Sequence, residues 1–146
     1  GIGDRINYYA AGDFISAEIV NDNIRTDWHY YALRKQNGTV HYTIDSLSLG
    51  ASGNANTFCS ESKLFIGKRN NVEYFIGTLD YIYIFDKSLE QNEIYNYMLS
   101  GLSGNEEDLV GCWNFNENGG YTIIDQSSNQ HDGVINGNPY WIQIYE

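Results

Sequence analysis

Apolar and polar residues alternate along several short segments near the start of the chain. Residues 5–10 are apolar at every second position (Ile6, Tyr8 and Ala10), which is the period of a half-buried strand. Residues 15–20 repeat this alternation after a break at residues 11–13. The pattern predicts two antiparallel strands that form a hairpin.

A second hairpin is predicted over residues 28–36 and 39–45. These two segments are separated only by Asn37-Gly38. This pair readily takes positive φ at both central positions of a type I′ turn, the turn whose twist suits a two-residue hairpin loop. The Asn-Gly turn is the most specific local signal in the sequence.

The remaining chain contains more short strands and one helix. Residues 46–57 are rich in Gly, Ser and Asn and predict a loop. From residue 88 to residue 100 the apolar period becomes about 3.6, with Ile94, Tyr97 and Met98 on one face, and Gly101 follows as a stop. Further strands are predicted over residues 63–67, 78–85, 109–115, 121–124, 133–135 and 140–144. The pattern favours an all-β sandwich with one short surface helix near 88–100.

Composition supports strands and excludes some partners. The chain of 146 residues has 13 Tyr and 6 Phe but one Pro, and aromatic side chains pack well on pleated sheets. Its formal net charge of -11 disfavours nucleic acid, whose binding requires clustered Lys and Arg, and no apolar stretch is long enough to insert into a membrane. The length fits one domain, and a start without Met suggests part of a larger multidomain protein.

The two cysteines leave two interpretations open. Cys59 falls in a polar loop, and Cys112 falls in a strand, on the face opposite Trp113. The pair has no zinc-type spacing and is too small for a disulfide scaffold. Either the two residues form one disulfide or they are independent thiols.

Three motifs, in this order, resemble segments of one known protein family. WHYYAL at 28–33 and HYTID at 41–45 resemble the family's W-H-H-V-A and L-Y-V-D-G strands. LFIG at 64–67 and GTLDYIYIF at 77–85, followed by the helix, resemble its I-G and G-x-I-D-E-V-R-I-Y segments. LVGCWNFNE at 109–117 and DQSSNQHDG at 125–133 resemble its tryptophan-rich element. In residues and order the three motifs resemble the laminin G-like family of concanavalin A-like jelly rolls, including its pentraxin-like members. The resemblance implies an antiparallel jelly-roll β-sandwich over residues 1–146.

The order of the motifs departs from the family in one respect. The tryptophan-rich element usually opens the domain, whereas in this chain it comes last. Residues 109–146 therefore either close the same sandwich, where the opening strands would lie, or begin a second repeat. Closure is favoured, because a sandwich without several strands would leave unpaired edges.

The sequence shows no arrangement that is typical of catalysis. Glucanases of the concanavalin A-like fold use spaced carboxylates such as E-x-D-x-x-E, and that spacing does not occur. His29, His41 and His131 fall on separate elements without a nucleophile elbow, so each is interpreted as a packed, hydrogen-bonded residue. We expect no enzymatic activity.

A calcium site is predicted at the turn near residue 125. Asp125, Ser127 and Asn129 place oxygen atoms at alternate positions, Asp132 follows, and calcium takes about six to eight oxygen ligands. Asp80, on the same strand face as the isoleucines that follow it, is predicted to point toward the core, where its carboxylate needs a partner, and it is counted among the calcium-site residues. In the resembling family calcium often lies near such loops. The alternative is that Asp125 and Asn129 only form turns through bonds to the backbone.

The expected function is recognition of a carbohydrate or protein ligand. Aromatic side chains can stack on sugar rings, although strands also pack them routinely. The candidates are Tyr8, Tyr9, Tyr30, Tyr31, Tyr42, Tyr121, Tyr140 and Trp141. The resemblance implies a non-catalytic extracellular module, secreted or surface-attached, that serves adhesion. The alternative is a structural spacer or assembly domain of an adhesin, an appendage or a virion surface protein.

Overall fold

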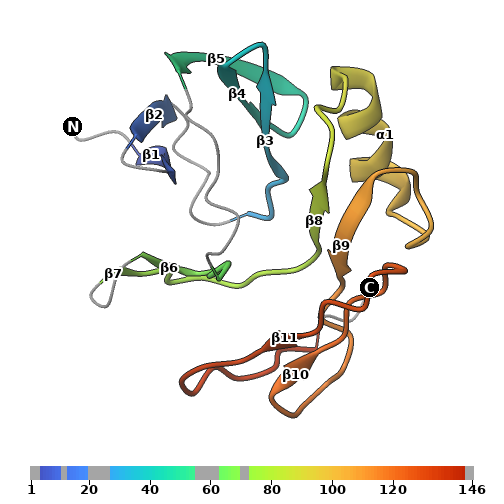
Figure 1. The fold of residues 1–146 in the computed structure, drawn as a ribbon. Coiled ribbons are helices and arrows are strands. Elements are labelled where there is room, and N and C mark those ends of the chain that lie inside the picture. Colours follow the sequence, from blue (N-terminus) through green and yellow to red (C-terminus); the bar gives the residue numbers. More distant parts are fainter. Residues whose placement is uncertain (1–3, 11–12, 20–26, 55–62, 70–72, 144–146) are drawn as a thin grey trace. The chain divides into compact units, whose positions relative to one another are not determined.

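The chain consists mostly of strands in small antiparallel sheets, with one short helix among the described residues (Figure 1). The structure is a computed structural model that describes residues 4–10, 13–19, 27–54, 63–69 and 73–143. It divides into two compact units. Unit 1 comprises Gly1–Lys63 and Ser88–Gly101, and unit 2 comprises Leu64–Lys87 and Leu102–Glu146.

Unit 1 contains both predicted hairpins. β1 (Asp4–Ala10) pairs antiparallel with β2 (Asp13–Ile19), which confirms the first hairpin. β3 (Tyr31–Gln36), β4 (Thr39–Ile44) and β5 (Leu47–Asn54) form a three-stranded sheet in that order. The second hairpin is therefore also confirmed, with a shorter first strand than predicted.

The predicted loop over residues 46–57 is wrong for most of its length. β5 occupies Leu47–Asn54, and residues 55–57 lie outside the described residues. In the register of the sheet, Leu47 pairs with Ile44 and Leu49 pairs with Tyr42. Pairing with an apolar neighbouring strand supplies the stabilisation that a segment rich in Gly and Ser lacks by itself, so tertiary context overrides the low strand propensity.

The turn between β3 and β4 has the predicted geometry. Asn37 has a φ of 51° and Gly38 a φ of 78°, so both central residues are left-handed. Gln36 and Thr39 are the last paired residues before the turn. The Asn-Gly pair therefore forms the type I′ connection that its sequence predicts.

One face of the three-stranded sheet provides the core of unit 1. Val40, Tyr42 and Ile44 alternate along β4 and are all buried. In the register, Leu33 lies opposite Tyr42, and Tyr31 lies opposite Ile44. Leu33 and Tyr31 remain exposed because β3 is the edge strand of this sheet.

The helix begins directly after its N-cap residue, Glu90. α1 covers Gln91–Ser100, three residues shorter at its start than the predicted span of 88–100. Glu90 is the N-cap, and its backbone N–H donates to Glu93 Oε2 at 2.7 Å. Ile94 is buried while Tyr97 and Met98 are half-buried, so the predicted face is the covered one. The helix ends at Gly101, whose N–H donates to the Tyr97 carbonyl at 2.9 Å.

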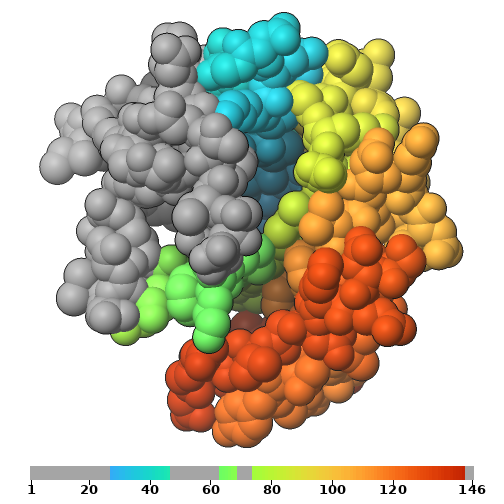
Figure 2. Space-filling model, in the orientation of Figure 1, coloured from blue at the N-terminus to red at the C-terminus, as the bar shows by residue number. Residues whose placement is uncertain are grey.

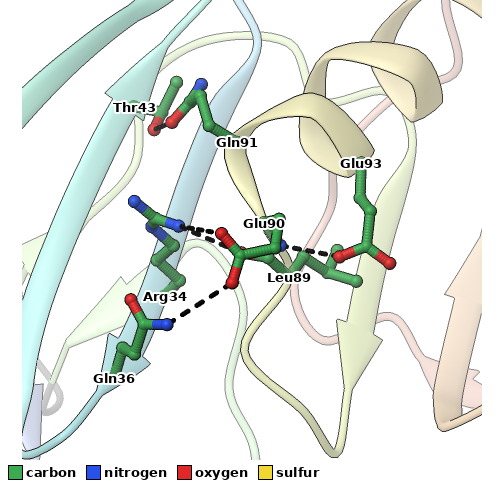
Figure 3. A network of polar contacts seen from close by, with 7 residues as sticks. All are labelled: Arg34, Gln36, Thr43, Leu89, Glu90, Gln91 and Glu93. Carbon is green, nitrogen blue, oxygen red and sulfur yellow. Dashed lines mark hydrogen bonds and ion pairs between the residues drawn. The ribbon is translucent and has the colours of Figure 1, made fainter.

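Polar contacts hold the start of α1 against the sheet of unit 1 (Figure 3). Arg34 Nη1 donates to the Leu89 carbonyl at 3.2 Å and lies 4.0 Å from the Glu90 carboxylate. Thr43 Oγ1 donates to Gln91 Oε1 at 3.1 Å. The surfaces of β3, β4 and α1 adjoin in the space-filling view (Figure 2). The helix is therefore anchored by side chains on the sheet face opposite Tyr42.

Unit 2 consists of short paired strands. β8 (Ile82–Phe85) pairs antiparallel with β9 (Leu109–Trp113), and the Asp86 N–H extends this ladder by donating to the Asp108 carbonyl at 2.9 Å. The other pairs are β6 (Lys68–Arg69) with β7 (Glu73–Tyr74) and β10 (Thr122–Ile123) with β11 (Gly133–Val134).

Two of the predicted strands, 63–67 and 140–144, are not strands over their described residues, and residue 144 lies outside those residues. Residues 63–67 are irregular, because Gly67 turns the chain with a φ of 74° and its carbonyl accepts the Phe75 N–H at 2.8 Å. Residues 140–143 also lack strand pairing, and Trp141 instead contacts the chain through its indole, which donates to the Gly120 carbonyl at 3.4 Å. Apolar alternation indicates a strand only where a neighbour offers backbone groups.

β9 provides most of the core of unit 2. Leu109, Cys112 and Trp113 are buried, as is Ile123 on β10. Cys112 and Trp113 are successive residues on opposite faces, so β9 is covered on both sides. The pairing of β9 with β8 joins the tryptophan-rich segment to residues 82–85, while the closure of one sandwich by residues 109–146 stays a prediction.

Candidate functional site

The predicted calcium loop is organised around the buried carboxylate of Asp125. Oδ1 accepts the backbone N–H groups of Cys112 at 2.8 Å and Ser127 at 2.9 Å. Oδ2 accepts the Ser127 hydroxyl at 2.8 Å and the His131 backbone N–H at 2.8 Å. The Asp125 side chain thereby links β9 to Ser127 and His131 in the turn that follows Asp125.

These contacts occupy the acceptor capacity of Asp125. A carboxylate has about four lone-pair sites, and four donors meet this one. Binding of a cation through Asp125 would therefore require replacing hydrogen bonds by metal contacts. The alternative of a turn-forming Asp125 agrees with the geometry, since the bond to the Ser127 N–H closes an Asx turn.

The other loop residues also bond within the protein. Asn129 donates its side-chain amide to the Leu109 carbonyl at 2.9 Å and the Val110 carbonyl at 3.1 Å. Asp132 Oδ1 accepts the Asp125 backbone N–H at 3.0 Å. Asp125, Ser127 and Asp132 are thus brought together, while the amide nitrogen of Asn129 faces β9. Within the part of the chain that the structure describes, no group of three His, Cys, Asp or Glu side chains is arranged to hold a metal.

The prediction that Asp80 points toward the core is wrong. Asp80 is exposed and precedes β8, which begins at Ile82. Tyr81 between them has a φ of 50°, and this left-handed residue interrupts the alternation on which the prediction depended. Partial burial raises the pKa of the Asp80 carboxyl, and a hydrogen bond from the Tyr81 backbone opposes that rise.

The titration of Asp125 makes a testable contribution to stability. Burial raises its pKa, but the hydrogen bonds from Cys112, Ser127 and His131 outweigh burial, so the net pKa is below the ordinary value. The stabilisation is therefore fully present above the unfolded pKa of about 3.9, and it is lost as pH falls through the lower folded pKa. We expect the difference in unfolding free energy between the wild type and Asp125→Asn to shrink below about pH 4. Urea unfolding between pH 7 and pH 2 measures this difference, and a constant difference would contradict it.

Cys112 is a free, buried thiol beside this carboxylate. Burial raises its pKa, and the negative charges of Asp125 and Glu106 raise it further. A thiol with a raised pKa is a poor nucleophile at neutral pH. Cys59 lies outside the described residues, and because Cys112 is free the disulfide alternative is not formed in this structure.

A second cluster of polar and aromatic side chains lies at the start of β3. The His29 Nδ1–H donates to Asp45 Oδ2 at 2.9 Å, and the Tyr30 backbone N–H donates to Asp45 Oδ1 at 2.9 Å. The His29 and Tyr31 rings meet edge to face, with centroids 6.3 Å apart. Trp28, next to His29, is 56 % exposed, and Tyr31 is 48 % exposed. We call Trp28, His29, Tyr31 and Asp45 the β3 entry cluster.

The backbone of unit 1 holds the β3 entry cluster in place. Asp45 has a φ of 51°, and its N–H donates to the Tyr30 carbonyl at 2.8 Å, which extends the β3–β4 ladder by one position. The Asp45 side chain is 45 % exposed and accepts two hydrogen bonds from the described residues. Bonds from the described residues therefore occupy two of the roughly four acceptor sites of this carboxylate, compared with four at Asp125.

The sequence-based aromatic candidates separate clearly by burial. Tyr42 is buried, and Tyr30 is half-buried, which raises the pKa of its phenol to about 12. Tyr31, Tyr121 and Tyr140 are exposed, while Trp141 is half-buried. The side chains of Tyr8 and Tyr9 lie outside the described part. The sequence-based ligand candidates do not include Trp28 or Asp45, although both belong to the quoted motifs. Only folding brings Asp45 to His29.

Comparison of the chain with protein-family models, curated protein sequences and solved structures finds no significant match. Among the described residues, no helix combines the length and the apolar character that crossing a membrane requires.

Proposed function

We propose that the chain is a non-catalytic binding module of an extracellular protein, with a jelly-roll β-sandwich fold, and that the β3 entry cluster recognises a carbohydrate. The proposal rests on the resemblance to laminin G-like lectin domains and on one observation. That observation is the exposure of Tyr31, whose ring meets the His29 ring that is bonded to the partly exposed Asp45 carboxylate, and of Trp28, the residue before His29.

The chemistry of the β3 entry cluster suits a sugar ring. The apolar C–H face of a sugar packs against aromatic rings such as Trp28 and Tyr31, and its hydroxyl groups donate to a carboxylate such as Asp45. His29 fixes the position of that carboxylate by its 2.9 Å hydrogen bond. Positions fixed before binding reduce the entropy that is lost when the ligand binds.

Removing the Trp28 ring is expected to weaken glycan binding by about tenfold or more, because the lost stacking is worth about 1.4 kcal/mol. Screening of the wild type on a glycan array, with calcium and with chelator, identifies the ligand. Titration of Trp28→Ala with that ligand by calorimetry gives the change in affinity.

The matched control is Tyr121→Ala, which removes another exposed aromatic ring, from unit 2. We expect its affinity to equal that of the wild type. Equal losses in the two variants would contradict a site at the β3 entry cluster. An array without any bound glycan, together with self-association in light scattering, would favour the spacer or assembly alternative.

A structural calcium ion is tested separately by thermal unfolding. An ion that binds only the folded state raises the free energy of unfolding by RT ln(1 + [L]/Kd), and the melting temperature rises with it. If the loop near Asp125 binds calcium, the wild type melts at higher temperature in calcium than in chelator, and Asp132→Asn reduces the difference. Equal melting temperatures would contradict a calcium ion at this loop and would leave its stabilisation to the hydrogen bonds that Asp125 and Asp132 accept.

A further inference from the structure

The tip of the β3–β4 hairpin presents an exposed asparagine in an N-glycosylation acceptor motif, which has no role in the proposed function. Asn37-Gly38-Thr39 is the single Asn-x-Ser/Thr sequence in the chain. Asn37 is exposed and occupies the first central position of the turn, with a φ of 51°. A side chain at the tip of a two-residue turn extends beyond both strands, so an attached group would not disturb the buried residues of β4.

We propose that Asn37 is an N-glycan acceptor when the protein passes through a secretory pathway. The inference rests on the extracellular location in the proposed function. In the transfer, Asn37 Nδ2 forms a bond to C1 of an oligosaccharide carried on a polyprenyl pyrophosphate. The bond between C1 and the pyrophosphate oxygen breaks, the pyrophosphate leaves with the electron pair, and the amide nitrogen gives one proton to a base. The Thr39 hydroxyl completes the acceptor motif.

The position of Asn37 is compatible with ligand binding at the β3 entry cluster. In the register, Gln36 pairs with Thr39 at the turn, and Tyr31 pairs with Ile44 at the opposite end of the same hairpin. Strands rise about 3.4 Å per residue, so the five steps from Tyr31 to Gln36 separate the two ends by roughly 17 Å. A glycan on Asn37 therefore projects from the end of the hairpin that is remote from Trp28 and Asp45.

Secretion of the full chain from a eukaryotic host, behind a heterologous signal peptide, tests the proposal. Intact-mass analysis is expected to show one glycan increment on the wild type, removed by peptide N-glycosidase with conversion of Asn37 to Asp. Asn37→Asp and Thr39→Val are expected to lack the increment, and Thr39→Ser is expected to retain it. Asp-Gly also forms type I′ turns, so Asn37→Asp removes the acceptor while preserving the hairpin.

Absence of the increment from secreted, folded wild-type protein would overturn the proposal, as would its persistence in Asn37→Asp. Circular dichroism of the same samples establishes that they are folded. Binding of the array-selected glycan is measured independently on the wild type before and after enzymatic deglycosylation, and we expect equal affinity. If the wild type carries no glycan on Asn37 but still binds the array-selected glycan, only this inference is contradicted. If Asn37 is glycosylated but no array glycan is bound, only the proposed function is contradicted.

Discussion

Replacing Asp125 by alanine is expected to lower the free energy of unfolding by more than about 3 kcal/mol. The carboxylate is 4 % exposed and accepts hydrogen bonds from Cys112, Ser127 and His131. Without it these donors lose their partner, and a buried donor without a partner costs about 1–3 kcal/mol. Urea unfolding followed by circular dichroism at pH 7 gives the change directly.

Asp132→Asn is the matched control for this prediction. It removes a neighbouring negative charge but keeps an oxygen that can accept the Asp125 backbone N–H. We expect its unfolding free energy to stay within about 1 kcal/mol of the wild type. Similar destabilisation by Asp125→Ala and Asp132→Asn would mean that the loop depends on charge and not on the hydrogen bonds that Asp125 accepts.

Truncating Trp113 to alanine is expected to destabilise the protein by about 3–5 kcal/mol, the usual cost of removing a buried aromatic side chain. Trp113 is 8 % exposed, and its indole N–H donates to the His131 carbonyl at 3.1 Å. Its ring also lies against Gly111, where an added Cβ would clash with the indole. The variant therefore loses both the packing of the ring on β9 and the hydrogen bond to His131 in the loop that follows Asp125.

Two companion variants separate these contributions. Trp113→Phe keeps most of the ring but loses the indole hydrogen bond, and we expect it to cost less than the alanine variant. Gly111→Ala introduces the clash with the indole and is expected to destabilise by about 1–3 kcal/mol through overpacking. If the free energy of unfolding of Trp113→Ala lies within about 1 kcal/mol of the wild-type value, the assignment of Trp113 to the core of unit 2 is contradicted.

Local signals predicted the hairpins and the helix well. The Asn37-Gly38 turn is determined by two adjacent residues, and the apolar face of α1 by the spacing of Ile94, Tyr97 and Met98. Contacts within a few residues dominate such elements, so the sequence contains the needed information. β5 was missed for the opposite reason, because its pairing with β4 stabilises a segment of low strand propensity.

The sites required information that the sequence alone did not contain. Alternating oxygen atoms at Asp125, Ser127 and Asn129 are compatible both with a metal loop and with a turn that bonds to the backbone. Only the fold shows that the Cys112 N–H of β9 reaches the Asp125 carboxylate, at 2.8 Å, while calcium binding stays a prediction. In the same way, the separation of 16 residues between His29 and Asp45 conceals their 2.9 Å contact until β3 and β4 pair.

The sequence by itself therefore determined the strand-rich character of the chain, the position of its helix and the geometry of one turn, because those follow from side-chain period and local backbone preference. The tertiary structure determined which carboxylate accepts four hydrogen bonds within the protein and which one remains partly exposed to solvent. Asp125 accepts hydrogen bonds from β9 and from its own loop, whereas Asp45, in the turn after the central strand β4, stays partly exposed. The physical reason is that hydrogen-bond saturation and burial depend on residues distant in sequence, which only folding brings together.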